Sequence, residues 1–324
     1  MSKFTRRAFL TAATASALTV ACNRSPRPQA ASKAASKTAT RVVALEWVYA
    51  ENLLALGIQP VGVADIPGYK KYVNVQPSLD ESVVDVGTRQ EPSLEAIAQL
   101  KPDLILGVDL RHQNIYDTLS AIAPTLIFNP YPSAENSNQL DEMQQTFRKI
   151  AESVNRQDVG EKVLQQMQTQ FHTAATRIKN TQKPDFVLGQ FSDNAPQIRL
   201  FTDNSMAAQI LTAIGLKNAW KGEFDRFGFN TVWVEALPKV ETANFIYISA
   251  PNSPYKQQLE TNPVWQKLQF VQQKRLYAIA PDTWLFGGPL SAQILVDKII
   301  KTLTEEAEGQ GAGSRGSKRK SQSR

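Results

Sequence analysis

The sequence predicts an α/β protein: two α/β lobes with mainly parallel sheets, joined by a long connecting helix, with a ligand cleft between the lobes. Three observations support this fold class. Continuous apolar runs of strand length alternate with helical patterns, as is typical of parallel strands that are buried on both faces. The second half of the body repeats the order of the first, and a long segment of helical periodicity separates the two.

The chain begins with the features of an export signal, which we assign to residues 1–22. Three basic residues precede an uncharged run over residues 8–21, which is shorter than the roughly 20 residues that a membrane-spanning helix needs. The segment TRRAFL resembles a twin-arginine signal for Tat export. An ordinary secretory signal peptide with two arginines is the alternative.

Cys22 is the only cysteine, so the chain has no intramolecular disulfide. It stands in LTVAC, which resembles the lipobox of bacterial lipoproteins, although Thr19 and Leu18 depart from the usual order. The resemblance implies lipidation of Cys22 and a lipid-anchored protein on the periplasmic side of the cytoplasmic membrane. Cleavage at an alanine, which leaves a free thiol, is the alternative.

Composition separates both ends of the chain from its body. Residues 23–40 are rich in Pro, Ser, Ala and Lys and are predicted to be a flexible tether; residues 308–324 are predicted to be a disordered basic tail. The signal, tether and tail contribute +3, +4 and +4 to the net charge of +6, so residues 41–307 carry −5. An acidic body offers no broad phosphate-binding surface, and no nucleic-acid partner is expected.

The N-terminal lobe is predicted over residues 41–136. Helical patterns at residues 50–57, 93–100 and 115–122 connect apolar runs of strand length. The runs lie at residues 41–45, 60–64, 82–87, 103–108 and 125–129.

The C-terminal lobe is predicted over residues 183–307, where the first-lobe plan recurs. AENLLALGI, which contains Gly57, matches AQILTAIGL, which contains Gly215. Each glycine stands where a helix needs a left-handed cap before a strand. Glu95 and Glu235 also occupy matching positions, with a different spacing.

The connecting segment is predicted over residues 137–182. Two stretches in it space their apolar residues by three and four, which indicates helices with one apolar stripe. Residues 155–158 are poor helix formers and mark a kink or a turn. The segment is a helical hairpin on one lobe, a spine that joins both lobes and restricts their hinging, or a coiled-coil dimer.

The residue inventory favours binding over catalysis. His112 follows the 103–108 run, where it could line the cleft, and no second histidine or cysteine lies near it to complete a metal site. His172, in the connecting segment, is interpreted as structural or solvated. No nucleophile, zinc-protease or phosphate-loop motif occurs in the body. Aromatic residues and Arg89 on loops at predicted strand ends indicate a recognition cleft instead.

Six segments of the body together resemble the periplasmic ferric-siderophore-binding proteins of ABC importers, most closely the ferric-hydroxamate type. They are RVVALEW, ENLLALGIQPVGVAD, DVGTRQEPSLEAIAQLKPD, IAPTLIFN, NAWKGE and WLFGGPLSA. The resemblance implies a monomeric substrate-binding lipoprotein that captures a ferric siderophore, of hydroxamate or citrate-hydroxamate type. It would deliver this ligand to an ABC permease and ATPase in the inner membrane for iron transport.

The same resemblance implies no enzyme activity and no intrinsic cofactor, since the ferric siderophore is the ligand. Two alternatives use the same fold. One is a receptor for cobalamin or haem, and the other is a periplasmic enzyme that acts on ferric chelates.

The resemblance also assigns site residues. The arginine of its DVG-x-R-x-EP segment, which contacts the oxygen atoms around the iron, corresponds to Arg89; an ion pair with Glu91 or Asp85 is the alternative. Aromatic residues of the cleft correspond to Tyr72, Phe227 and Trp284, and the loop of Trp284 adds Phe286.

One departure concerns the identity of the ligand. Relatives of the hydroxamate type carry a tyrosine after the fourth strand, where this chain has Leu110, Arg111 and His112. An additional cation at Arg111 would suit a chelate with negative charge, and Arg226 could serve similarly, unless it is a solvated loop residue.

Glu95 and Glu235 match acidic residues that dock onto the permease in the resembling family, one on the outer face of each lobe. For each glutamate, a solvated position in a first helical turn, favoured by the helix dipole, is the alternative.

Overall fold

A computed structural model describes residues 39–133, 137–179, 185–250 and 252–318 of the chain. The predicted export signal, Cys22 and residues 23–38 of the predicted tether lie outside the described residues. None of the helices in the described ranges combines the length and the apolar character needed to cross a membrane.

The first lobe is built on a five-stranded sheet in the order β3-β2-β1-β4-β5, and all four pairings are parallel. The strands are β1 (Val42–Ala44), β2 (Gly62–Val63), β3 (Val84–Asp85), β4 (Leu104–Val108) and β5 (Thr125–Phe128). The helices are α1 (Trp47–Ala55), α2 (Ile66–Tyr72), α3 (Leu94–Gln99), α4 (Asp109–His112), η1 (Gln113–Ile115) and α5 (Tyr116–Ile122).

Each predicted strand of this lobe is present, although β3 differs from the others in burial. Val84 is 41% exposed, because β3 is the edge strand and has a neighbour on one side only. Side chains of β1 alternate between two cores. Val42 and Ala44 pack into the largest core cluster, whereas Val43, and Leu45 directly after the strand, face the helices on the other side of the sheet.

The second lobe is built on a six-stranded sheet in the order β11-β10-β6-β7-β9, with β8 also paired to β6. Its strands are β6 (Asp185–Phe191), β7 (Ile198–Phe201), β8 (Lys217–Asn218), β9 (Phe229–Val232), β10 (Asn244–Ile248) and β11 (Leu276–Ile279). The helices are α8 (Met206–Ala213), η2 (Val234–Val240), α9 (Pro254–Glu260), α10 (Pro263–Lys267) and α11 (Gln269–Gln272). β7 runs antiparallel to both β6 and β9, a departure from the plan of the first lobe.

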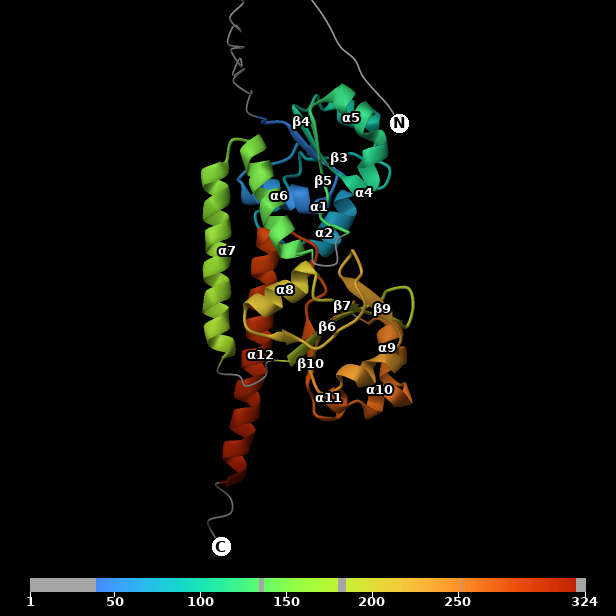
Figure 1. The fold of residues 1–324 in the computed structure, drawn as a ribbon, viewed down its shortest axis with the longest axis vertical. Coiled ribbons are helices and arrows are strands. Elements are labelled where there is room, and N and C mark those ends of the chain that lie inside the picture. Colours follow the sequence, from blue (N-terminus) through green and yellow to red (C-terminus); the bar gives the residue numbers. More distant parts are fainter. Residues whose placement is uncertain (1–38, 134–136, 180–184, 251, 319–324) are drawn as a thin grey trace, which may run out of the picture. The chain divides into compact units, whose positions relative to one another are not determined.

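The connecting segment forms two helices, α6 (Gln139–Ser153) and α7 (Gln157–Ile178). The turn between them includes Asn155, whose backbone is left-handed with φ 55°, at the position where the sequence predicts a kink or turn. α7 packs against α6, α8 and the long α12 (Pro289–Lys318), beside which it runs in Figure 1. The segment therefore combines the predicted hairpin with the predicted spine.

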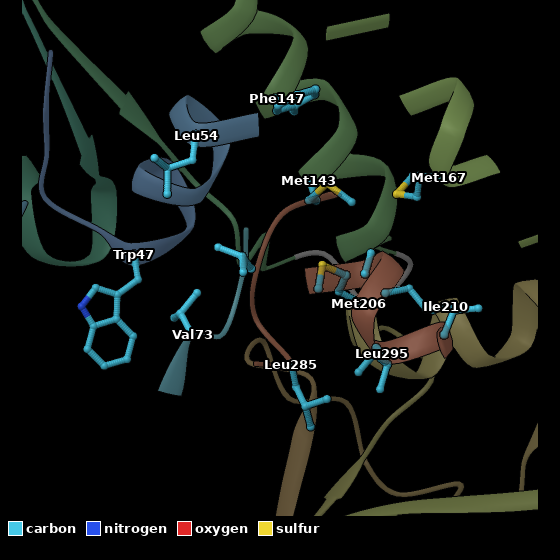
Figure 2. Packing of buried hydrophobic residues seen from close by; sticks show 14 of the residues in the cluster. Trp47, Leu54, Val73, Met143, Phe147, Met167, Met206, Ile210, Leu285 and Leu295 are labelled. Carbon is cyan, nitrogen blue, oxygen red and sulfur yellow. The ribbon is translucent and has the colours of Figure 1, made fainter. Parts of the chain in front are cut away.

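A single hydrophobic cluster extends through both lobes and the connecting helices. Figure 2 shows its members from α1, α6, α7, α8 and α12 packed together. They include Leu54, Met143, Phe147, Met167, Met206, Ile210 and Leu295. Since a close-packed core resists sliding and opening, this shared core restricts hinging of the lobes.

A buried carboxylate joins the first lobe to the start of α12. Glu51 on α1 accepts hydrogen bonds from the backbone N of Ser291 at 2.8 Å and from its Oγ at 2.7 Å. Burial raises the pKa of Glu51. A Cβ on Gly288 would lie 2.2 Å from Asn52 Oδ1, so a larger residue there would have to displace the buried Asn52 side chain.

The described backbone and the sequence prediction differ over residues 308–318. Composition predicts a disordered tail from residue 308, whereas α12 is helical as far as Lys318. Extending an existing helix is far easier than nucleating a new one. The core-facing positions of α12 are buried up to Leu303, which provides the formed end from which the helix continues.

Gly57→Ala should lower the free energy of unfolding by about 1–2 kcal/mol, because Gly57 has φ +74° and alanine is strained in that region. An added Cβ would meet no atom within 4 Å beyond the chain neighbours, so the cost comes from the backbone alone. Urea unfolding monitored by circular dichroism measures it. Gly57→Asn is the matched control and should lose less, since asparagine tolerates left-handed backbone. An alanine variant as stable as wild type would contradict this account.

Candidate functional site

Two adjoining hollows of about 320 and 270 Å³ lie between the lobes and share Arg89, Arg199, Trp284 and Phe286. This volume suits a ligand of small-molecule size. The first lobe contributes residues at the carboxyl ends of its strands, where parallel sheets bind ligands. The first-lobe lining comprises Glu46, Trp47, Val48, Tyr72, Arg89, Val108, Leu110, Arg111, Pro130 and Tyr131.

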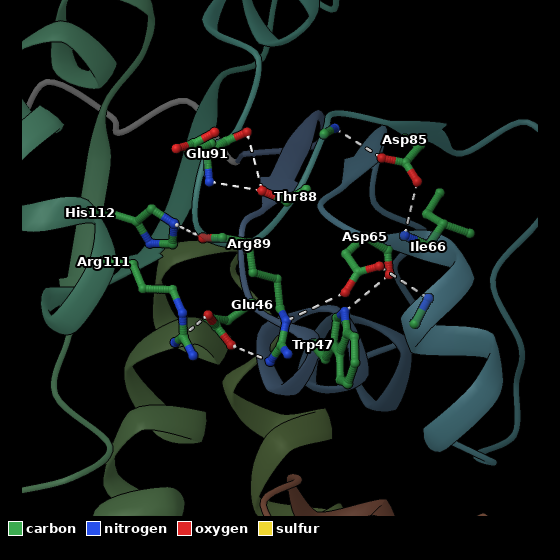
Figure 3. A network of polar contacts seen from close by, with 12 residues as sticks. Glu46, Trp47, Asp65, Ile66, Asp85, Thr88, Arg89, Glu91, Arg111 and His112 are labelled. Atoms are coloured by element: carbon green, nitrogen blue, oxygen red, sulfur yellow. Dashed lines mark hydrogen bonds and ion pairs between the residues drawn. The ribbon is translucent and has the colours of Figure 1, made fainter. Parts of the chain in front are cut away.

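Arg89 lies on a loop that is closed by its own backbone. Gly87 and Pro92 form an isolated antiparallel bridge, and the backbone N of Glu91 donates to Thr88 Oγ1 at 2.9 Å. Gly87 has φ +95°, and a Cβ there would lie 3.1 Å from Glu91 O. The tight loop fixes the direction in which Arg89 leaves the sheet (Figure 3).

The two first-lobe arginines that line the cleft converge on one carboxylate. Arg111 Nη1 lies 2.7 Å from Glu46 Oε1, and Arg89 Nη1 lies 3.4 Å from Glu46 Oε2. Figure 3 shows Glu46 between the two guanidinium groups. Burial raises the pKa of Glu46, while Arg111 and Arg89 oppose the rise.

Arg89 is held by two further contacts. Its guanidinium carbon lies 3.6 Å from the centre of the Trp47 ring, within the range of a cation–π contact. Its Nε lies 3.7 Å from Asp65 Oδ2, and the backbone O of Asp65 accepts a hydrogen bond from Trp47 Nε1. The alternative partners proposed from the sequence are not used: Asp85 accepts from the backbone N of Ile66 and of Gly87.

His112 holds the Arg89 loop from inside the first lobe. It is fully buried; its Nδ1 accepts from the backbone N of Val108 at 2.9 Å, and its Nε2 lies 3.0 Å from Arg89 O. With Nδ1 as acceptor, Nε2 carries the proton and donates to Arg89 O. Burial lowers the pKa of His112. The expected place for His112 on the cleft lining is therefore wrong, because its ring points into the lobe.

Aromatic rings form a continuous wall beside these charges. Tyr72 stacks on Trp47 with ring centres 6.0 Å apart, and Trp284 meets Trp47 edge-on at 5.1 Å. The wall continues in the second lobe from Trp284 through Phe286 and Phe229 to Phe227. Tyr131 closes it on the first-lobe side, edge-on to Phe227 at 5.3 Å. Burial raises the pKa of Tyr131 to about 12, so its phenol stays neutral.

The structure brings six of the seven predicted ligand-binding residues to this lining. They are Arg89, Tyr72, Phe227, Trp284, Arg111 and Phe286. Arg226 does not line either hollow: its Nη2 donates to the backbone O of Tyr131 at 3.2 Å, and its guanidinium lies 5.6 Å from the Phe227 ring centre. Arg226 therefore links the second lobe to the backbone of the first lobe at Tyr131.

Within the described ranges, no group of three or more histidine, cysteine or acidic side chains is arranged to hold a metal ion. The cleft instead presents guanidinium donors and ring faces. Donors of this kind bind oxygen-rich anions and chelates, in which the ligand itself supplies the metal's coordinating atoms.

The periplasmic binding protein family matches residues 42–283, most of the chain. The chain belongs to this family. The family is one of transporter binding proteins rather than enzymes.

Two curated relatives of this periplasmic binding protein are each 31% identical to it. The iron(3+)-hydroxamate-binding protein FhuD of Escherichia coli matches over 263 residues, which is 81% of this chain and 86% of the relative. The Fe(3+)-citrate-binding protein YfmC of Bacillus subtilis matches over 268 residues, 82% and 81% of the two chains. Among solved structures, the siderophore-binding protein FhuD of Vibrio cholerae, bound to Fe3+-Desferal, is 30% identical with a TM-score of 0.74. That match covers 82% of this chain and 97% of the other.

Sequence reasoning on this binding protein did not find Glu46, Trp47, Tyr131 or Arg199. Two of them carried a usable signal, because Glu46 and Trp47 directly follow the β1 run, at the edge where parallel strands end. Arg199 lies within β7, 3.4 Å from Gln190 Oε1 and 4.7 Å from the Phe229 ring centre. Arg199 is exposed between the buried Ile198 and Leu200, and nothing in its local sequence distinguishes a cleft position from ordinary surface.

Stability should depend on pH through His112. Because its folded-state pKa lies below the ordinary value of 6.5, the unfolded chain takes up the proton first. The contribution of neutral His112 is therefore present above that value and is lost as the pH falls towards the folded-state pKa. Urea unfolding between about pH 7 and pH 5 should show a smaller loss of stability for His112→Gln than for wild type.

The matched control is His172→Gln, since His172 is exposed on α7. It should keep the wild-type pH dependence. Equal pH dependence in wild type and His112→Gln would contradict a buried neutral imidazole behind the Arg89 loop.

Proposed function

We propose that this chain captures a ferric siderophore between its lobes and delivers it to an ABC permease for iron uptake. The observation that carries the proposal is the set of three guanidinium groups, Arg89, Arg111 and Arg199, which line one cleft beside a wall of aromatic rings. Guanidinium forks suit the oxygen atoms around the iron, and the rings suit the organic arms of the chelate.

The relatives support this assignment by what they bind. The E. coli relative binds iron(3+)-hydroxamate, the B. subtilis relative binds Fe(3+)-citrate, and the V. cholerae neighbour holds Fe3+-Desferal. The two curated relatives are equally similar in sequence, so identity alone does not choose between hydroxamate and citrate. We infer a ferric chelate whose ligating atoms are oxygens, with the choice left to residues of the cleft.

Export and anchoring form part of the same proposal. Two B. subtilis relatives, YhfQ and YfiY, are described as lipoproteins, which supports lipidation at Cys22 after export with the Tat-type or secretory signal. The chain would act as a monomer tethered to the outer face of the cytoplasmic membrane.

Docking to the permease is assigned to Glu95 and Glu235. Both are exposed and lie in first helical turns, Glu95 in α3 and Glu235 in η2. Neither lines the cleft described above. One carboxylate on each lobe allows a permease to contact both halves of the loaded protein.

Arg89→Ala should weaken the binding of a ferric hydroxamate at least tenfold, since a charge-assisted hydrogen bond of about 1.5–3 kcal/mol is lost. Quenching of tryptophan fluorescence reports binding, because Trp47 and Trp284 line the cleft. A panel of ferric hydroxamate, catecholate and citrate chelates identifies the ligand class for the wild type.

Arg148→Ala is the control for Arg89→Ala. Arg148 forms an exposed ion pair with Glu161, at 2.7 Å on the α6–α7 hairpin, and its removal should leave chelate affinity unchanged. Unaltered affinity in Arg89→Ala, or no response of the wild type to any chelate, would contradict the proposal.

The double variant Glu95→Ala/Glu235→Ala should reduce uptake of a radioactive ferric chelate by cells that express the protein with its permease. Its affinity for the chelate should equal that of wild type, because both side chains lie outside the cleft. Glu152→Ala, exposed on α6, is the matched control and should transport normally. Wild-type uptake by the double variant would remove both glutamates from the docking surface.

A further inference from the structure

Glu46 changes the charge that the cleft presents to a ligand. The sequence suggests Arg111 as an additional cation that would favour an anionic chelate. In the structure, however, Glu46 is shared by Arg111 and Arg89 at 2.7 and 3.4 Å. The Glu46 side chain is 10% exposed, and those of the arginines are 22% and 18% exposed. The second positive charge that the first lobe contributes to the cleft lining is therefore already neutralised within the protein.

The remaining charges do not restore a strong cationic site. Asp65 Oδ2 lies 3.7 Å from Arg89 Nε, and Asp193 lines the hollow of about 270 Å³ together with Tyr72. Arg199 contacts Gln190 and the ring of Phe229, and no described carboxylate lies within ion-pair distance of it. The residues that line the two hollows include three arginines and two acids, Glu46 and Asp193. With Asp65, which lies beside Arg89 outside the lining, the formal charges of these six residues sum to zero.

Glu46 nevertheless leaves hydrogen-bond donors for a ligand. Its two carboxylate oxygens pair only with Nη1 of each arginine, whereas each guanidinium group carries five N–H donors. The remaining donors are oriented by this shared carboxylate before any ligand arrives. Glu46 therefore preserves the hydrogen-bonding capacity of the two arginines while it removes part of their electrostatic attraction for anions.

We propose that Glu46 is a specificity-determining residue that makes the cleft prefer a neutral ferric trihydroxamate over a negatively charged ferric citrate complex. This inference rests on the proposed function. Placing a carboxylate where a partly buried chelate binds repels each negative charge of that chelate. A trihydroxamate, whose three negative groups balance the charge of the iron, avoids this repulsion.

Burial of Glu46 fits a functional role. Burial raises its pKa despite two adjacent guanidinium groups, so keeping an ionised carboxylate here carries a desolvation cost. A fold often tolerates replacement of a whole buried ion pair by apolar residues, whereas removal of one partner alone is usually destabilising. A role in discriminating between ligands would explain why the protein keeps a buried carboxylate here despite its desolvation cost.

The test measures two affinities for each variant by tryptophan fluorescence at neutral pH and low salt. The probes are ferrichrome, a neutral ferric trihydroxamate, and ferric citrate in excess citrate. Glu46→Gln should bind ferric citrate about tenfold more tightly than wild type, with ferrichrome affinity changed by less than about threefold. Added salt should weaken its citrate binding more steeply than that of wild type.

A second variant works in the opposite direction. Arg111→Gln removes the cation but keeps Glu46, so ferric citrate should weaken relative to ferrichrome. The double variant Glu46→Gln/Arg111→Gln removes one charge of each sign, so the ratio of the two affinities should return towards wild type. Glu161→Gln, which breaks the exposed pair with Arg148, is the matched control and should alter neither affinity.

The outcomes separate this inference from the proposed function. Wild type that binds neither probe nor any other ferric chelate removes the proposed function. If the wild type binds a chelate and the ratio of the two affinities is unchanged in Glu46→Gln, the proposed role of Glu46 is wrong and the proposed function stands. If Glu46→Gln alone fails to fold, the comparison of Arg111→Gln with Glu46→Gln/Arg111→Gln decides, because these two variants differ only in the charge at position 46, and the double variant should bind ferric citrate more tightly.

Discussion

Everything at the cleft depends on one carboxylate shared by two guanidinium groups. Glu46 follows β1, Arg89 lies on the loop after β3, and Arg111 follows β4, so three chain segments meet only because their parallel strands end at the same edge. Charges this close in a partly buried setting interact far more strongly than they would in water. The contact orients both arginines, and it also sets how much positive charge a ligand meets.

Rigidity around this contact comes from neutral parts of the structure. His112 holds the backbone of Arg89 through its Nε2, and Trp47 lies against the guanidinium carbon at 3.6 Å. At a larger scale, the core shared by both lobes and the bond from Ser291 to Glu51 limit how far the halves can separate. A recognition site built on such supports needs little rearrangement to accept its ligand, which lowers the entropic cost of binding.

Some structural features could be predicted from the sequence and others could not. The strands of the first lobe were predictable because strands covered on both faces need continuous apolar runs, and Gly57 and Gly215 were predictable as left-handed caps. Both have positive φ in the structure. The antiparallel direction of β7 was not predictable, because buried and exposed side chains alternate in the same way along a strand whichever direction it runs. Arg199 was missed because it is exposed between buried residues of this strand, as any solvated strand residue would be.

The sequence by itself determined the two-lobed α/β fold, the helical connection and most residues of the aromatic wall, because these follow from local periodicity and from the position of loops at strand ends. Only the tertiary structure decided which charges neutralise one another. Arg111 counts as a free cation in the sequence, and it is paired at 2.7 Å with a residue 65 positions away. Electrostatic pairing depends on distance in space, and local sequence carries no record of that distance.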